Sequence, residues 1–493
     1  MGSSGCRYME VRRTGLILKP NSARVLVRPF EFPDTQRVVR ILGRLMELTE
    51  LEVAQLLPQV MAEFRGRHVR LQEIFFQRFA TVEPHLLTDR PLSEARKLLI
   101  GACFTQEYAL ESAALFNPSI VWHPNQDGVP EGSRRFILSL RCTGEGHISS
   151  VGFRSGIVDS QGNITIDRPT GFVTPPRVIP HAQYDKALFF KKLAELGLAD
   201  GFVETLSALL DDHFSMDDLE RAIRFVLRQN PVHRPRWEPV SRSVLALAKA
   251  NYQIQCDPDS DLSERVIFPY APTEKNGIED VRLVQFTEDD GSIRYYGTYT
   301  AFDGDVVFPQ IFETTDFVHF KVDTLNGPEV RNKGFALFPR KINGLYAMLS
   351  RQDGENIYLM YSEMLHFWYT KQLLMRPMFP WEVVQIGNCG SPIETEAGWL
   401  VLTHGVGPMR KYAIGAALLD RDDPSRVLAR LPEPLLSPNA NEREGYVPNV
   451  VYTCGAVVHE GLLVIPYAMA DYATTFAVIP LDDVLRAMVP VSK

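Results

Sequence analysis

From about residue 117 onward the chain is a succession of short runs rich in β-branched and aromatic residues, separated by turns that contain Gly, Asp or Asn. This alternation limits the fold more than any other feature, because runs of about four to seven residues are typical of strands. Examples are RRFILSL, RYYGTYTAF, LYAMLSR, NIYLMYS, GWLVLTHGV and LLVIPYA. Strands spaced in this way over about 300 residues predict a sandwich, a barrel or a propeller. The runs recur in a unit of roughly 50–65 residues, which favours a propeller.

The region before these strands has the three-to-four residue spacing of amphipathic helices, from residue 34 to residue 110. Asp34 is placed as the N-cap of the first helix, and Ser93 precedes Glu94 at the start of the third helical stretch. No residue of this region points to chemistry. We expect these helices to pack on a neighbouring surface or to support a homo-oligomer.

A second helical stretch, about residues 181–230, interrupts the strand pattern. Ser215, followed by Asp217 and Asp218, predicts a helix start, and Pro231 with the segment PVHRPRWEP predicts the end. We interpret the stretch as an insertion between two blades that forms one body with the N-terminal helices. The expected division is an N-terminal segment and helical region (1–111), a first blade (112–180), a helical insertion (181–250) and the remaining blades (251–493).

Composition excludes several classes of function. The net charge of −8 and the absence of basic runs argue against nucleic acid as a partner. The sequence contains no run of 18 or more apolar residues, so no membrane span is expected. The N-terminal residues lack the apolar core that is typical of a secretion signal. The six cysteines are scattered, without metal-ligand spacing, which predicts buried free thiols and a cytoplasmic location. No metal and no organic cofactor is expected.

One acidic segment stands at the start of a predicted strand. Glu279-Asp280-Val281-Arg282 follows a Gly turn and precedes apolar residues, so it is either an acid/base site or a surface ion pair. The cationic or titratable residues next to other strands form an anion pocket if they converge, and are solvated loop charges if they do not. They are Lys333, Arg351, His404 and Arg443.

Seven segments, in order along the chain, carry a likeness to a known family. They are Phe116-Asn117-Pro118-Ser119 with Leu140-Arg141, Gly277-Ile278-Glu279-Asp280-Val281-Arg282, Tyr299-Thr300-Ala301-Phe302-Asp303-Gly304, Phe338-Pro339-Arg340-Lys341-Ile342-Asn343-Gly344, Gly398-Trp399-Leu400 with Thr403-His404-Gly405-Val406, Glu442-Arg443-Glu444-Gly445, and the stretch from Tyr467 to Asp471. Together they resemble glycoside hydrolase family 130, the inverting mannoside phosphorylases and related mannosidases. The likeness covers about residues 112–178 and 255–485.

The resemblance implies a five-bladed β-propeller in which Asp280 is the general acid, protonating the glycosidic oxygen of a β-linked mannoside through a hydroxyl of the bound mannose. By the same resemblance, the residues that bind this mannose are Asn117, Arg141, Arg282 and Asp471. Lys333, Arg351 and His404 match members of the cationic cluster that holds inorganic phosphate. Phosphate then attacks the anomeric carbon and gives α-mannose 1-phosphate. An ionised phosphate oxygen needs no protein base, so one acid is sufficient.

Two positions depart from the family pattern. Gln385 stands where the family usually has a phosphate-binding lysine, and Lys333 stands where it has an arginine. Glutamine keeps a hydrogen-bond donor but loses a charge, which leaves hydrolysis by water as the alternative reaction. The candidate bases for hydrolysis are Glu394, Glu396, Glu442 and Glu444. A third alternative is a carbohydrate-binding propeller without catalysis.

Each site residue also has a structural interpretation. Asn117 is compatible with a turn before Pro118, and His404 with a strand end hydrogen-bonded to backbone. Arg141 and Arg351 are compatible with pairing inside the propeller channel. Three aromatic residues, Trp368, Tyr369 and Trp399, are compatible both with packing in blade cores and with stacking on a sugar.

Overall fold

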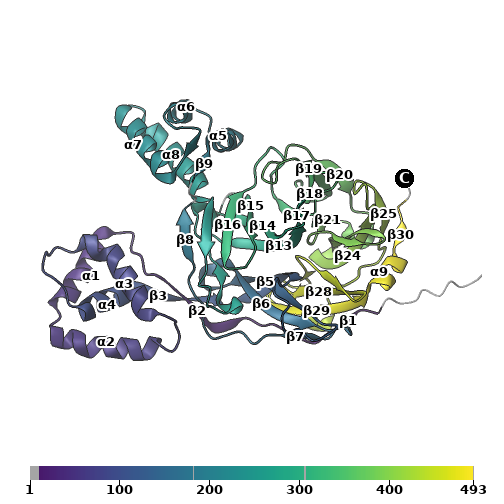
Figure 1. Ribbon diagram of the computed structural model, residues 1–493, viewed down its shortest axis with the longest axis horizontal. Helices are drawn as coiled ribbons and strands as arrows, with labels where there is room; N and C mark the ends of the chain where they lie inside the picture. The colour runs from purple at the N-terminus through teal and green to yellow at the C-terminus, as the bar shows by residue number, and fades with distance from the viewer. Residues whose placement is uncertain (1–9, 181–182, 305–306, 492–493) are drawn as a thin grey trace, which may run out of the picture.

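The computed structural model describes residues 10–180, 183–304 and 307–491. An all-β core carries one group of helices before it and a second group inserted into it (Figure 1). No helix among the described residues combines the length and apolar character that crossing a bilayer requires. Cys6 lies outside the described residues. The other five cysteines are free thiols, of which Cys103 is exposed, against prediction, and four are buried as predicted.

The described core contains five sheets of four or more strands. The first sheet contains β4 (Ala114–Trp122), β5 (Arg134–Thr143), β6 (Ser149–Val158), β7 (Ile164–Ile166) and β12 (Val266–Ile267), and the second contains β8 (Arg177–Pro180), β11 (Tyr252–Gln255), β13 (Ile278–Thr287), β14 (Ile293–Phe302), β15 (Val307–Thr314) and β16 (His319–Thr324). The third sheet contains β17 (Lys333–Leu337), β18 (Tyr346–Arg351), β19 (Ile357–Ser362) and β20 (Gln372–Met375), and the fourth contains β21 (Gln385–Asn388), β22 (Ile393–Thr395), β23 (Gly398–Gly407), β24 (Lys411–Leu419), β25 (Val427–Arg430) and β30 (Val489–Pro490). The fifth sheet contains β1 (Arg12–Arg13), β26 (Val451–Tyr452), β27 (Val457–His459), β28 (Leu462–Met469) and β29 (Ala473–Pro480).

Each of the five sheets packs against the next one along the chain, and the fifth packs against the first. A separate cluster of buried apolar side chains fills each of these five interfaces. Representative ring contacts are Phe153 with Phe320, Phe286 with Tyr346, Phe338 with Trp399, and Phe136 with Phe476. Leu402 and Ile465 belong to the cluster between the fourth and fifth sheets. Trp368 and Trp399 are fully buried in such clusters, which confirms their interpretation as core residues.

The strands β4, β13 and β17, which contact neighbouring sheets, each contain a break in register near one end. Asn117 and Asp280 lie in two of these breaks with φ angles of 48° and 54°, and Gly334 lies in the third with φ of 94°. Asn and Asp tolerate this left-handed backbone better than other side chains, and glycine adopts it freely. A bulge re-aims the side chain that it carries. The bulges therefore set the direction of the first two side chains.

Three short 3-10 turns precede the strands β13, β21 and β26. They are η4 (Pro272–Glu274), η5 (Pro380–Glu382) and η7 (Ala440–Glu442), in that order. Each ends in a buried glutamate, which caps the turn by accepting backbone N–H groups. Glu274 also accepts hydrogen bonds from two tyrosines, Glu382 from Arg430, and Glu442 from Arg13 and Tyr467. Burial of a charged group is tolerated only with such partners, so these glutamates anchor the loops that lead into β13, β21 and β26.

The N-terminal helices are α1 (Thr35–Glu47), α2 (Glu50–Phe64), α3 (Leu71–Val82) and α4 (Glu94–Cys103). The predicted caps Asp34 and Ser93 are confirmed. The prediction of helix up to residue 110 is wrong, because β3 (Thr105–Glu111) pairs with β2 (Asn21–Pro29). Tyr108 and Leu110 enter the cluster between the fifth and first sheets, and this burial outweighs helix propensity.

The inserted helices are α5 (Lys186–Glu195), α6 (Gly201–Ala208), α7 (Met216–Gln229) and α8 (Arg234–Lys249), with a small hairpin of β9 (Tyr184–Asp185) and β10 (His213–Phe214). The predicted start at Ser215 is confirmed by its capping box with Asp218. Helix α7 ends at Gln229, just before Pro231, as predicted, but the segment that was expected to end the helical stretch begins a further helix, α8. Pro235 lies in the first turn of α8, where no N–H donor is needed, and only Pro239 lies deeper in the helix.

The two helical groups each have their own apolar core. They lie apart in Figure 1, where α1–α4 extend from one side of the β-core and α5–α8 stand over β8 and β16. The interpretation that they form one body is therefore wrong, because each amphipathic face is already covered within its own group. A short helix, α9 (Leu481–Ala487), packs on β29 near the C-terminal end.

Candidate active site

Asp280 is held by groups from two other strands. The side-chain amide of Asn117 on β4 donates a hydrogen bond of 2.6 Å to Oδ1 of Asp280, and the Arg141 guanidinium on β5 lies 3.3 Å from the same oxygen. Arg141 also forms a 2.8 Å ion pair with Glu279 and donates to Ser149. Asn117, Arg141 and Asp280, three of the predicted site residues, are thus in direct contact.

The pKa of Asp280 is the balance of opposing effects. Burial raises the pKa of this carboxyl, but the positive charges of Arg141, Lys333 and Arg282 lower it, and so does the hydrogen bond from the amide on β4. The net shift is downward. With no ligand bound, Asp280 is therefore a carboxylate at neutral pH, stabilised by cations that a bound anion would neutralise.

Arg282 contacts Asp280 through the backbone: its guanidinium donates to the Asp280 carbonyl oxygen at 3.4 Å. Its Nε donates to the backbone oxygen of Cys389 at 2.9 Å, and its guanidinium donates to the Tyr452 hydroxyl at 2.7 Å. The residue is buried, and it joins β13 to the fourth and fifth sheets. The structure thus places Arg282 beneath the site, where it supplies charge and connects three sheets.

Asp471 lies in the hairpin between β28 and β29, where Ala470 and Asp471 both have left-handed backbone with φ of 48° and 51°. Burial and the negative charge of Asp280 raise the pKa of Asp471 to about 6, against the lowering effect of Arg141 and Arg410. This mutual influence places Asp471 in the same polar site. Its protonation changes within a pH range in which ordinary aspartates stay ionised.

Arg351 and His404 form a buried pair beside this carboxylate group. An N–H of the Arg351 guanidinium donates to Nε2 of His404 at 2.8 Å, on neighbouring strands of the third and fourth sheets. Gly387 makes room for the pair, since a Cβ there would lie 2.4 Å from the imidazole. The Nε of Arg351 and the Nδ1 of His404 are buried and have no hydrogen-bond partner among the described residues. Two donors are therefore left for an anion.

His404 differs in charge from its predicted role. Burial, with the charges of Arg351, Arg282 and Lys333, lowers the pKa of His404 well below the usual value. The ring is therefore neutral at physiological pH, and because Nε2 accepts from Arg351, the proton is on Nδ1. His404 contributes a hydrogen-bond donor and not a positive charge.

Lys333 and Gln385 lie at the border of this anion cluster. The Lys333 side chain is 40% exposed, and its Nζ lies 3.9 Å from Oε2 of Glu279. Gln385 is linked to the cluster through Tyr412, whose hydroxyl it contacts at 3.5 Å and whose ring stacks on His404. The structure thus brings Lys333, Arg351 and His404 together near Asp280. Gln385 reaches this cluster only through Tyr412.

The four glutamates considered as bases for hydrolysis have other surroundings. Glu442 is buried, accepts hydrogen bonds from Arg13 and Tyr467, and caps η7. Glu394 pairs with Arg340 and Arg421 on the fourth sheet. Glu396 and Glu444 are exposed. Among these four, no carboxylate is both buried and available to activate a water. Arg443, the remaining cation named from the sequence, is exposed and bound to Asn449.

Several residues of the site escaped the sequence-based interpretation. Glu279 shares Arg141 and Lys333 with Asp280, and its position next to Asp280 was the available signal. Tyr452 holds Arg282, and Arg410 acts on Asp471 through its charge. Asn388 has a buried Oδ1 without a partner among the described residues. These contacts join residues far apart in the chain, which no local pattern reveals.

Comparison with known proteins supports an assignment to the carbohydrate-active enzymes. The sequence profile described as beta-1,4-mannooligosaccharide phosphorylase matches residues 258–489. A 1,2-beta-oligomannan phosphorylase from Thermoanaerobacter sp. (strain X514) is 36% identical over 43% of this chain and 71% of its own length. A beta-1,2-mannobiose phosphorylase from Listeria innocua is 30% identical over 45% of this chain and 63% of its own.

A solved structure titled beta-1,2-mannobiose phosphorylase from Listeria innocua, in complex with beta-1,2-mannobiose, has 21% identity and a TM-score of 0.46, over 77% of this chain and 92% of that one. The protein is an enzyme of the glycoside phosphorylase and hydrolase class. The chain belongs to glycoside hydrolase family 130.

Proposed function

We propose that this enzyme carries out inverting phosphorolysis of a β-linked mannoside or manno-oligosaccharide and releases α-mannose 1-phosphate. Relatives that are 36% and 35% identical are named as phosphorylases of β-1,2-linked mannosides. The observation that carries the proposal is the adjacency of two unlike groups. A carboxyl held by Asn117 and Arg141 lies next to a cluster, Lys333 with Arg351 and His404, that offers donors and charge to an anion.

On the acid side, Asp280 supplies the proton that the leaving sugar oxygen needs when the glycosidic bond breaks. Asn117, Arg141 and Asp471 surround it and bind the hydroxyls of the mannose to be cleaved. Arg282 supports this half of the site from below through Tyr452 and Cys389. Because cations hold Asp280 as a carboxylate without ligand, proton uptake accompanies binding of the anionic co-substrate.

On the nucleophile side, inorganic phosphate binds to Arg351, Lys333 and the Nδ1–H of His404, with Gln385 at the border. A phosphate oxygen forms a bond to the anomeric carbon while the bond to the leaving oxygen breaks. The charge of the phosphate also offsets the cations that depress the pKa of Asp280. Phosphate binding therefore prepares the acid for proton transfer.

Water is the less favoured nucleophile. An inverting hydrolase needs a second carboxylate as base, placed to leave room for the water. Glu394 and Glu442 are each engaged by two partners, and Glu396 and Glu444 are exposed. The donors left unpaired at Arg351 and His404 form stronger hydrogen bonds to an anion than to a neutral water.

We propose further that the five larger sheets are the blades of a five-bladed β-propeller. The cyclic order of their contacts supports this, as do the five separate apolar clusters between them. In this arrangement β4 to β7 with β12 form the first blade, and β1, near the N-terminus, joins the fifth. The helical insertion, about residues 181–250, leaves and re-enters the second sheet between β8 and β11, so the expected division into 112–180 and 251–493, with the insertion between two blades, is corrected. The bulged ends of β4, β13 and β17 then meet at one mouth of the central funnel.

Replacement of the acid tests the proposal. Asp280→Asn keeps the side-chain shape and the left-handed backbone, and should lower kcat/KM about 10²- to 10⁴-fold, the usual contribution of a general acid. The matched variant Asp422→Asn changes an exposed aspartate on the fourth sheet and should have no effect. Release of mannose 1-phosphate from β-1,2- and β-1,4-mannobiose is the measurement. Full activity of Asp280→Asn would remove the basis of the proposal.

A further inference from the structure

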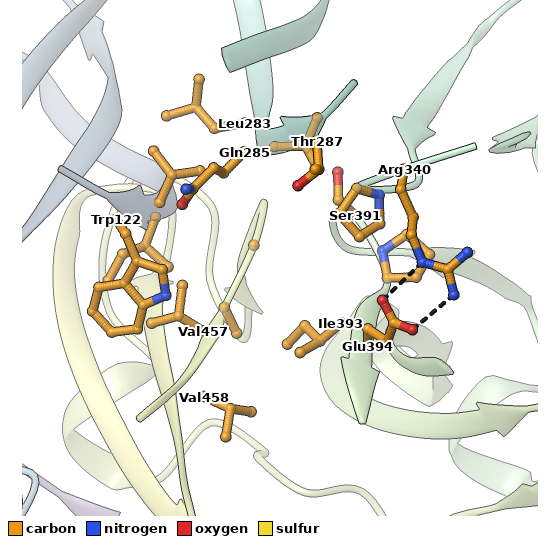
Figure 2. Close-up of a pocket in the computed structure, with 17 residues that line it drawn as sticks. Trp122, Leu283, Gln285, Thr287, Arg340, Ser391, Ile393, Glu394, Val457 and Val458 are labelled. Atoms are coloured by element: carbon orange, nitrogen blue, oxygen red, sulfur yellow. Dashed lines mark hydrogen bonds and ion pairs between the residues drawn. The ribbon is translucent and has the colours of Figure 1, made fainter. Parts of the chain in front are cut away.

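Besides the candidate active site, a second place in the core is a cavity of about 330 Å³, at the ends of β4 and β13 that lie away from Asn117 and Asp280 (Figure 2). Its lining comes from, or lies next to, strands of all five larger sheets: residues 120–122, 283–285 with 287, 339–340, 391–394 and 455–458. On β4, Asn117 belongs to the candidate active site and Trp122 to this cavity; on β13 the corresponding residues are Asp280 and Gln285. Five residues of strand span roughly 16 Å, so the two places are distinct.

The backbone between the two places is closely tied. Ser119 accepts a hydrogen bond from the Leu283 N–H and donates to the Cys454 oxygen. Gly455 leaves no room for a side chain, because a Cβ there would lie 2.7 Å from the Ser119 hydroxyl. These contacts separate the second cavity from Asp280, so it requires its own explanation.

Polar side chains without protein partners converge on this cavity. Among the described residues, the amide of Gln285, the hydroxyl of Thr287 and the indole N–H of Trp122 make no hydrogen bond to protein. The Ser391 hydroxyl also lacks a partner there, but it has almost no accessible surface and does not open into the cavity. In Figure 2 the indole nitrogen of Trp122 and the hydroxyl of Thr287 face the open centre. Donors and acceptors left in this state are satisfied by water or by a ligand.

The charge of the lining is balanced. Arg340 and Glu394 are the charged residues among those that line the cavity, and they form a bidentate pair of 2.7 and 3.0 Å at its edge. No free cation of the lining attracts an anion, and the carboxylate of Glu394 is occupied. The rest of the wall is apolar, with Ile393, Val457 and Val458 facing the same space. The cavity therefore suits a neutral ligand that has both hydroxyl groups and apolar C–H surface.

We propose that this cavity is a second saccharide-binding site, which takes one neutral sugar residue without cleaving it. A sugar ring presents hydroxyls to Gln285, Thr287 and Trp122 and its C–H face to the apolar wall. A purely apolar ligand would displace water from these polar groups without replacing its hydrogen bonds, which costs binding free energy. Glu394 is the only carboxylate of the lining and is held by Arg340, so no acid is available for reaction. The inference rests on this lining and not on the chemistry at Asp280.

The test is a crystal structure of the full chain soaked with D-mannose and, separately, D-glucose, together with ligand-observed NMR titration of the same sugars in solution. The expected result is a sugar in the cavity of Figure 2. Thr287→Val and Gln285→Ala should each weaken binding at this site about five-fold, the equivalent of one neutral hydrogen bond. Ser160→Ala, at an exposed serine, is the matched control.

Two readouts keep this test separate from the proposed reaction. Thr287→Val should leave turnover of mannobiose unchanged, whereas Asp280→Asn should lower kcat/KM about 10²- to 10⁴-fold and leave the second site occupied in the crystal. The inference is overturned if neither sugar occupies the cavity at millimolar concentration. It is also overturned if both cavity variants bind the sugars as the unsubstituted chain does, since Gln285→Ala changes a half-buried residue and does not endanger folding.

Discussion

Replacement of Arg351 by methionine separates the two halves of the site. Arg351 is 8% exposed, donates to Nε2 of His404 at 2.8 Å, and keeps a further N–H without a partner among the described residues. A charge-assisted hydrogen bond contributes about 1.5–3 kcal/mol, so its loss should raise KM for phosphate about 10- to 150-fold. KM for the mannoside should change little, because Asn117 and Arg141 remain in place.

Initial rates at varied phosphate and fixed mannobiose, then the reverse, give the two constants. Lys371→Met is the matched control, because Lys371 is a cation near β20 of the same sheet that pairs with Glu329 at the surface. Thermal unfolding checks the fold, since Arg351→Met also leaves a buried imidazole nitrogen without a donor. An equal rise of KM for both substrates, or none for phosphate, would refute the assignment of Arg351 to the anion.

Three further predictions follow from the structure. Because the pKa of Asp471 is raised to about 6, the folded chain binds more protons than the unfolded chain between about pH 4 and 6. The free energy of unfolding should therefore fall as the pH rises through this range. Asp471→Asn should raise Tm at pH 7 but not at pH 4. Glu382→Gln breaks the buried pair with Arg430 and should cost about 3–5 kcal/mol in urea unfolding, whereas Glu238→Gln, at an exposed pair on α8, should cost less than about 1 kcal/mol. Gln385→Lys adds a cation at the border of the anion cluster and should lower KM for phosphate by up to about five-fold; an unchanged KM would show that this position does not face phosphate.

Local sequence signals predicted local structure well. The caps at Asp34, Ser93 and Ser215 are confirmed, because capping involves residues within three positions of each other. The strand β3 was missed, because its pairing with β2 joins residues that lie far apart in the chain. Glu111 on β3 is buried between Arg24 and Arg154. No local sequence pattern predicts this cluster, because its three residues are far apart in the chain.

The candidate site shows the same division. The local pattern suggested that Asp280 pairs with Arg282, two positions away, but the structure gives Asp280 the guanidinium of Arg141 and the amide of Asn117. Arg282 faces Cys389 and Tyr452 instead. The resemblance to the family predicted the set of residues at the site. The contacts between these residues depend on the packing of the sheets and on the bulges at positive φ, and neither the packing nor the bulges can be recognised in a single sequence.

The central claim is that phosphate, and not water, takes the mannosyl group. The direct measurement is NMR of the full chain with β-1,2-mannobiose, with and without inorganic phosphate, following the anomeric proton and the phosphorus signal of the product. The account predicts α-mannose 1-phosphate in the presence of phosphate and no cleavage without it. Free mannose released at the same rate in both samples would contradict it.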